Sequence, residues 1–114
     1  MRGHLREAVR AAQDHKAVNM EVLDVGEVCS FTDYFLICSG TSTRHTRAIS
    51  DAISEHLKKE SGIAPAHLEG YAQGEWILLD YFSFVVHIFS ERAREFYDLE
   101  RLWKTAPRVP LPKS

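Results

Sequence analysis

The chain has 114 residues, of which 45% are hydrophobic and 26% charged, and its net charge at pH 7 is -2. This length and composition are typical of one globular domain, so we expect neither a second folded domain nor a disordered chain. A general nucleic-acid binder is also excluded, because such proteins carry an excess of basic residues that attracts the phosphate backbone.

Cysteine content and apolar runs bear on where the protein works. Cys29 and Cys38 are too few for a disulfide scaffold and do not form a C-x-x-C pair, which is typical of the reducing cytosol. No apolar run reaches the roughly 18 residues of a membrane span, and residues 1–16 carry acidic side chains without an apolar segment. We therefore expect a cytoplasmic protein with no membrane span and no signal or transit peptide.

One helix and two strands are predicted for the first part of the chain. Apolar residues recur at helical spacing over residues 2–15, which indicates an amphipathic helix. Residues 18–25 alternate between apolar and polar side chains, as a strand with one wetter face does. After a polar turn, residues 34–38 form a continuous apolar run that is typical of a strand buried on both faces.

A long helix is predicted for residues 43–60. Gly40 ends the preceding strand, and hydroxyl side chains at residues 41–43 are candidates for capping the helix N-terminus. Gly62 stands where a left-handed residue commonly ends a helix, and Pro65 prevents continuation. Both ends of this helix are therefore marked in the sequence.

Three strands, a final helix and a tail follow. The strands are predicted for residues 66–71, 75–81 and 84–90, of which the last two are expected to form a hairpin. Ser90 is a candidate cap for the final helix, whose predicted buried stripe comprises Phe96, Leu99, Leu102 and Trp103. An extended tail is predicted from the spaced prolines Pro107, Pro110 and Pro112.

The predicted order of elements is α-β-β-α-β-β-β-α. It indicates an α/β fold, a single domain with a mixed five-stranded sheet flanked by helices. We place this domain at residues 1–106 and a proline-spaced C-terminal tail at residues 107–114. No internal repeat interrupts the order.

The six histidines are the first place to look for a metal centre, because imidazole is a common transition-metal ligand. They lie on different predicted elements and form neither an H-E-x-x-H motif nor a Cys/His cluster. We therefore expect no bound metal and no cofactor.

The turn from Gly40 to Arg47 is the sharpest candidate for chemistry. A turn that leads into a helix N-terminus aims free backbone N–H groups at an anion, and a small nucleotide-binding or nucleotidyltransferase-like enzyme could use it. However, the turn lacks the glycines of a Walker loop, and no paired carboxylates follow it to hold Mg²⁺. Helix capping with solvated basic side chains is therefore favoured over a weak anion site at Thr41, Ser42 and Arg44.

The predicted hairpin carries apolar residues on both faces if its turn falls at Phe82-Ser83. Alternation then places one set of side chains on a core face: Ile77, Leu79, Val86 and Ile88. The other face combines aromatic, aliphatic and polar side chains: Trp76, Leu78, Asp80, Val85, His87 and Phe89. Such a mixture is typical of a surface that another protein covers, and equally of one covered by a helix of the same chain.

Four segments resemble the ribosomal silencing factor family (RsfS, Iojap-like). They are residues 30–44, residues 69–81 with the motif Trp76-Ile77-Leu78-Leu79-Asp80-Tyr81, residues 85–89 and residues 94–103. The segments occur in the family's order and spacing, and the resemblance covers nearly the whole chain.

This resemblance implies a nucleotidyltransferase-like fold that has no demonstrated catalytic role, so we expect a protein that is not an enzyme. It implies binding to the large ribosomal subunit through ribosomal protein L-fourteen, with at most minor contacts to ribosomal RNA. Occupation of that face would sterically block joining of the small subunit and repress translation when nutrients are scarce. Relatives also form homodimers, so we expect a homodimer when the protein is free.

Carried over to this chain, the resemblance places the partner surface at Trp76, Leu78, Asp80 and Tyr81, with His87 and Arg108 as further candidates. The hairpin turn departs from the family pattern, because many members have Gly-Asp where this chain has Phe82-Ser83. Since a tight turn favours Gly or Asn, we expect this turn to be longer or differently shaped.

Overall fold

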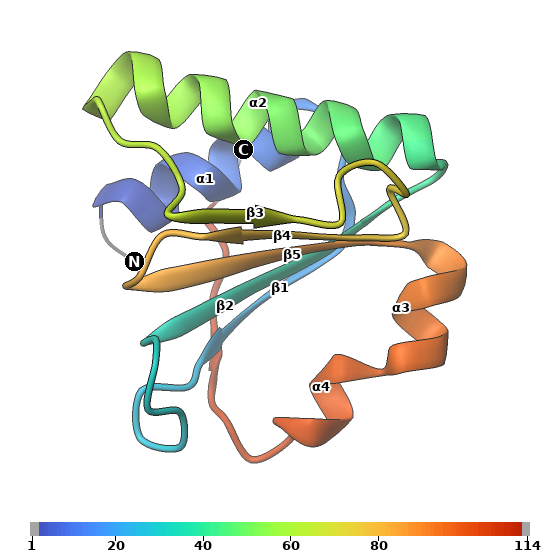
Figure 1. Cartoon of the computed structure of the whole chain (residues 1–114). Coiled ribbons are helices and arrows are strands. Elements are labelled where there is room, and N and C mark those ends of the chain that lie inside the picture. Colours follow the sequence, from blue (N-terminus) through green and yellow to red (C-terminus); the bar gives the residue numbers. More distant parts are fainter. Residues whose placement is uncertain (1–2, 113–114) are drawn as a thin grey trace.

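The computed structural model describes residues 3–112, which form one α/β domain (Figure 1). Its sheet has the strand order β3-β4-β5-β2-β1-β6, in which β2 and β5 are parallel and all other neighbours are antiparallel. The strands are β1 (Val18–Asp24), β2 (Tyr34–Gly40), β3 (His67–Glu69), β4 (Trp76–Asp80), β5 (Phe84–Ser90) and β6 (Arg108–Val109). The helices are α1 (Gly3–Asp14), α2 (Thr43–Ser61), α3 (Glu91–Tyr97) and α4 (Leu99–Leu102).

Helices α1 and α2 lie side by side over one face of the sheet (Figure 1). Their apolar stripes pack on the strand residues that point to this face, as the helical spacing in the sequence predicts. Burial of these side chains supplies the hydrophobic free energy that holds the two layers together. The cluster includes Leu5, Val9, Ile49, Ile53 and Leu57 from the helices and Ile77, Leu79, Val86 and Ile88 from the hairpin.

The other face of the sheet is covered unevenly. Helices α3 and α4 lie beneath it (Figure 1), and their side chains pack with those of β1, β2 and β5. Val85 and Phe89 of β5 are buried there, whereas Trp76 and Leu78 of β4 are partly exposed. The predicted cover by the chain's own helices is therefore confirmed for β5, whereas β4 is left half open and its cover by another protein stays a prediction.

The predicted signals at both ends of α2 are confirmed. The Ser42 side chain accepts a hydrogen bond from the His45 N–H at 3.0 Å, which satisfies an otherwise unpaired donor of the first turn. At the other end, Gly62 adopts the left-handed conformation with φ 69°, and its N–H donates to the carbonyl oxygen of Lys58.

The sheet has six strands, so the prediction of five is wrong. The additional strand, β6, comes from the segment that was expected to be an extended tail, and it pairs antiparallel with β1. The Asp24 N–H donates to the Pro107 carbonyl oxygen at 2.9 Å, and the Gln13 side chain donates to the Pro112 carbonyl oxygen at 3.0 Å. These hydrogen bonds hold the proline-spaced segment against β1 and α1. Strand β6 has only two residues, which is too short for a strand pattern to be recognised in the sequence.

The final helix is two helices, so its predicted continuous stripe is wrong in part. Asp98 has φ 46°, the left-handed conformation, and separates α3 from α4. Leu99 is buried and Trp103 partly buried, as predicted, but Phe96 and Leu102 are exposed. The break turns α4 relative to α3, so one helical stripe cannot face the sheet along both.

The hairpin between β4 and β5 has the predicted faces. Its turn is tight rather than long, because the Tyr81 N–H donates to the Phe84 carbonyl oxygen at 2.9 Å. Its shape is unusual for the residues present, since Phe82 has φ 67° and the Ser83 N–H donates to the Tyr81 carbonyl oxygen. A positive φ at a bulky residue is a strained conformation, which the two flanking hydrogen bonds hold in place.

Candidate protein-binding surface

Strand β4 presents Trp76, Leu78 and Asp80 on the half-open face of the sheet. Alternation along the strand puts these three side chains on one side and buries Ile77 and Leu79 on the other. All three are partly exposed, because β3 and β4 extend beyond the cover of α3. We call Trp76, Leu78 and Asp80 the β4 surface.

Trp76 is held in place by neighbours from two other elements. Its indole N–H donates to Nδ1 of His87 at 3.1 Å, and its ring lies 4.8 Å from the ring of Phe89, between centroids. The ring centroid of Tyr97 in α3 is also 4.8 Å from that of Trp76, and it lies 6.4 Å from that of Phe89, so the three rings form one cluster. An aromatic side chain fixed before binding loses little conformational entropy on binding, which is typical of interaction hot spots.

His87 lies under this surface rather than on it. The side chain is buried, and burial lowers the pKa of its imidazole to about 4, so the ring is neutral at pH 7. Because its Nδ1 accepts the Trp76 hydrogen bond, the proton resides on Nε2. The structure therefore places His87 as a support for Trp76.

The structure does not bring Tyr81 and Arg108 to the β4 surface. Tyr81 is buried on the opposite face, where its ring stacks on Phe84 and burial raises the pKa of its hydroxyl to about 12. Arg108 is in β6, with three strands between it and β4, and its Nε donates to Glu21 at 2.8 Å.

Tyr97 and Phe96 lie beside the β4 surface, although neither was predicted to belong to it. Tyr97 contacts Trp76, and Phe96, expected in a buried stripe, is 79% exposed with its ring centroid 5.0 Å from that of Tyr97. The available signal is Asp98, since Asp tolerates the left-handed conformation better than most residues. A helix end at this position frees Phe96 from the buried stripe.

The turn at Gly40 caps α2, which confirms the capping part of the favoured interpretation, whereas the basic side chains of His45 and Arg47 are not simply solvated. Besides the Ser42 cap, the Thr41 N–H donates to Nδ1 of His45 at 2.9 Å. His45 Nε2 contacts the His15 carbonyl oxygen at 2.7 Å, and Arg47 donates to the Ala72 carbonyl oxygen. Arg44 is exposed. Most of the groups that were candidates for binding an anion therefore already make hydrogen bonds within the chain.

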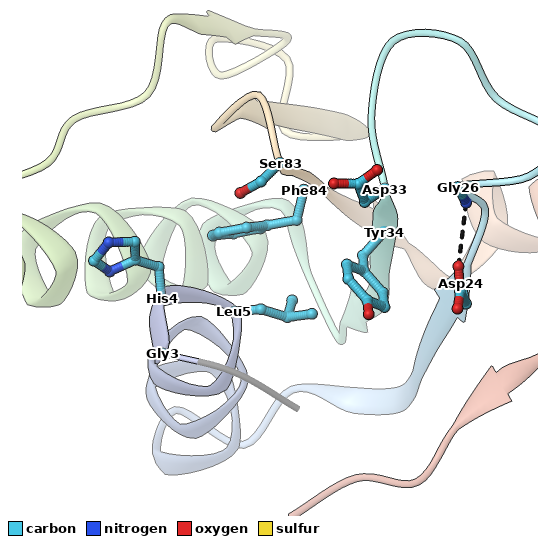
Figure 2. Close-up of a pocket in the computed structure, with 9 residues that line it drawn as sticks. All are labelled: Gly3, His4, Leu5, Asp24, Gly26, Asp33, Tyr34, Ser83 and Phe84. Carbon is cyan, nitrogen blue, oxygen red and sulfur yellow. Dashed lines mark hydrogen bonds between the residues drawn. The ribbon is translucent and has the colours of Figure 1, made fainter.

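A cavity of about 560 Å³ lies near the opposite end of β2 (Figure 2). It is lined by two acidic side chains, Asp24 and Asp33, and by residues of α1, β2 and the hairpin turn. Asp24 accepts a hydrogen bond from the Gly26 N–H at 3.2 Å (Figure 2), so it also stabilises its own turn. Since β2 is seven residues long, roughly 20 Å separates this cavity from the Gly40 turn. The carboxylates and the basic turn therefore do not form one nucleotide site.

Residues 3–112 also bear on metal binding and membrane insertion. Within this range no group of three or more His, Cys, Asp or Glu side chains is placed to hold a metal ion. No helix among these residues has the length and apolar character needed to cross a bilayer. The β4 surface remains as the contiguous part of the predicted partner surface that the structure leaves accessible.

The fold and this surface define a small α/β domain with a partly exposed strand surface in which Trp76 is fixed by its neighbours. The model of the RsfS family, described as "Ribosomal silencing factor during starvation", matches residues 1–114. The chain belongs to this family, and the resemblance found in its sequence is confirmed.

Individual relatives agree with the family match. The "Ribosomal silencing factor RsfS" proteins of Halalkalibacterium halodurans and Bacillus subtilis are 39% and 36% identical over 107 residues, which is 94% of this chain and 91% and 90% of theirs. The mouse protein "Mitochondrial assembly of ribosomal large subunit protein 1" is 36% identical over 98 residues, 83% of this chain and 42% of its own length. A crystal structure of a Bacillus halodurans protein has a TM-score of 0.82 and 38% identity, covering 94% of this chain and 96% of that chain.

Proposed function

We propose that this protein binds the large ribosomal subunit through ribosomal protein L-fourteen and sterically blocks joining of the small subunit, which represses translation when nutrients are scarce. Membership in a family of ribosomal silencing factors supports a ribosomal partner. The name of the mouse relative refers to the large ribosomal subunit, which supports the choice of subunit. The protein is proposed to act in the cytoplasm without catalysing a reaction.

The observation that carries this proposal is the β4 surface. Trp76 and Leu78 are apolar yet partly exposed, and Trp76 is fixed by His87, Phe89 and Tyr97. An aromatic anchor held in one position favours binding to a preformed protein surface. Steric exclusion requires a body of defined size at the subunit face, and it requires no active site.

Ribosomal RNA and a second copy of the chain are the other partners to consider. The net charge of -2 favours docking on ribosomal protein with at most minor contacts to ribosomal RNA. A homodimer of the free protein remains part of the proposal. Its dissociation on ribosome binding would be required if the dimer covered the β4 surface.

The binding step is tested by co-sedimentation with purified large subunits. We expect Trp76→Ala to weaken binding by at least about thirty-fold, because truncating a hot-spot aromatic typically costs 2 kcal/mol or more. Tyr81→Phe is the matched control, since it removes a buried hydroxyl without a hydrogen-bond partner on the opposite face. Binding of folded Trp76→Ala at the wild-type level would remove the β4 surface from the interface.

The blocking step is tested separately by light scattering. Adding the protein to dissociated subunits is expected to lower the scattering of joined particles in proportion to occupancy of the large subunit. If a saturating concentration of the protein left the scattering equal to that of subunits without the protein, the anti-association mechanism would be contradicted even if binding were observed. Titration of nucleotide with Mg²⁺ addresses the enzyme alternative at the Gly40 turn, and we expect no heat of binding.

A further inference from the structure

An aromatic series continues from the β4 surface onto α3. The ring of buried Phe89 contacts Trp76, Trp76 contacts Tyr97, and Tyr97 meets Phe96 edge to face at 89°. Exposure increases along this series, from none at Phe89 to half of Tyr97 and 79% of Phe96. Large aromatic side chains that are both contiguous and exposed are unusual on a monomer surface and indicate an interaction site.

Residues of this aromatic series line two concavities. One, of about 300 Å³, is lined by Glu69, Gly70, Trp76 and Leu78. The other, of about 410 Å³, is lined by Glu75, Arg92, Ala93, Phe96 and Tyr97. Concavities lined by these aromatic rings allow a partner to insert its own side chains beside them, which is typical of a well-packed interface centre.

The border of this area is acidic. Glu69 and Glu75 line the two concavities, and further carboxylates come from Asp80, Glu91 and Glu95 in the adjoining elements. Arg92 lines one concavity with its Nη2 3.5 Å from Glu75, so these two charges offset each other and the excess negative charge comes from the remaining carboxylates. A phosphate backbone would be repelled by such a border, whereas lysine and arginine side chains would be attracted.

We infer that Trp76, Leu78, Tyr97 and Phe96 form one aromatic platform across β4 and α3, and that its occupant is a basic protein surface with an apolar centre rather than RNA. The inference rests on the proposed function and deepens it: it extends the interface onto α3 and states the chemistry of the partner. Tyr97 and Phe96 contact that partner directly.

The test is co-sedimentation of the full chain with salt-washed large subunits over a range of ionic strength. The double variant Phe96→Ala/Tyr97→Ala is expected to lose at least about ten-fold in affinity. Phe31→Ala is the matched control, because Phe31 is 64% exposed in the loop at the other end of the sheet. Far-ultraviolet circular dichroism checks folding, and Phe96→Ser alone, at a side chain already exposed, provides a second variant.

Charge is tested with Glu69→Lys/Glu95→Lys, two exposed positions on β3 and α3. A basic protein partner predicts weaker binding by this variant and a wild-type affinity that falls as salt rises. Tighter binding would indicate RNA and overturn the assignment. If the Phe96 and Tyr97 variants bound the large subunit with wild-type affinity while Trp76→Ala lost affinity, the aromatic platform would be overturned and the proposed function would stand. Failure of the wild-type chain to bind any large subunit would instead overturn the proposed function, and the inference with it.

Discussion

Trp76 and His87 are joined by a hydrogen bond of 3.1 Å from the indole N–H to the imidazole Nδ1. They are diagonal neighbours on adjacent strands, since Trp76 pairs with Phe89 and Leu78 pairs with His87. Nε2 of His87 is buried and has no hydrogen-bond partner among the described residues. A neutral, buried histidine therefore holds the central side chain of the β4 surface, and its protonation would break that contact.

Stability is expected to fall when the pH is lowered from 6.5 toward 4. The pKa of His87 is lowered by burial to about 4, from 6.5 in the unfolded chain, so between these values the unfolded state binds more protons. The stabilisation is thus present above pH 6.5 and is lost as pH falls, by about 3 kcal/mol in total. Urea unfolding at a series of pH values measures it.

The matched variant for this measurement is His87→Gln, which removes the titrating ring and retains an oxygen that can accept from Trp76. Its free energy of unfolding should vary less than that of the wild type between pH 6.5 and 4. Equal pH dependence in both proteins would show that His87 is not the titrating group.

Arg94 of α3 connects α4 and the sheet through hydrogen bonds to Glu100 and Ser39. Its guanidinium donates to Ser39 and Glu100 at 2.9 Å each, and the Arg94 side chain is 12% exposed. Burial raises the pKa of Glu100, but the hydrogen bond and the positive charge of Arg94, together with further hydrogen bonds to the carboxylate, outweigh this effect and hold that pKa below its usual range. Arg94→Ala would leave Glu100 without its partner, so we expect a loss of about 2–3 kcal/mol in urea unfolding.

Arg92→Ala is the control for Arg94. The Arg92 side chain is 85% exposed and its contact with Glu75 is 3.5 Å long, so removal should change stability by less than about 0.5 kcal/mol. Similar losses in the two variants would contradict the assignment of a connecting role to Arg94.

Gly70 brings the loop after β3 against the start of β4. It has φ 78°, and a Cβ at this position would lie 1.9 Å from the Trp76 carbonyl oxygen. Gly62 has φ 69° but open space around it. Gly62→Ala should therefore cost only the left-handed strain of about 1–2 kcal/mol, whereas Gly70→Ala must also displace backbone and should cost at least about 2 kcal/mol more. Equal thermal unfolding midpoints for the two variants would contradict this difference.

Local rules were sufficient for much of the fold. The ends of α2 follow from Ser42 and Gly62, and the two faces of the hairpin follow from strict alternation. The same alternation places Tyr81 with Ile77 and Leu79 on the core face. Its assignment to the partner surface came from the family resemblance, which does not specify the face of each residue.

Features that depend on distant contacts were missed. Strand β6 has two residues and exists because β1 offers it an unpaired edge, which no local pattern reveals. The break at Asp98 leaves an uninterrupted helical spacing in the sequence, so Phe96 was expected inside. The same break exposes Phe96 beside Tyr97, and the candidate surface was therefore underestimated on the side of α3.

Ser42 is predicted to act as a helix cap and not as an anion ligand. Its hydroxyl oxygen accepts from the His45 N–H, so Ser42→Ala should destabilise the protein by about 1 kcal/mol, while Ser42→Asp should retain the cap and most of the stability. Urea unfolding with and without 10-fold excess nucleotide distinguishes the two roles. An anion site would make the wild-type protein more stable in nucleotide and Ser42→Asp less responsive, because a second negative charge would repel the ligand. We expect no nucleotide effect on either protein, since the helix N-terminus is already satisfied by its own side chains.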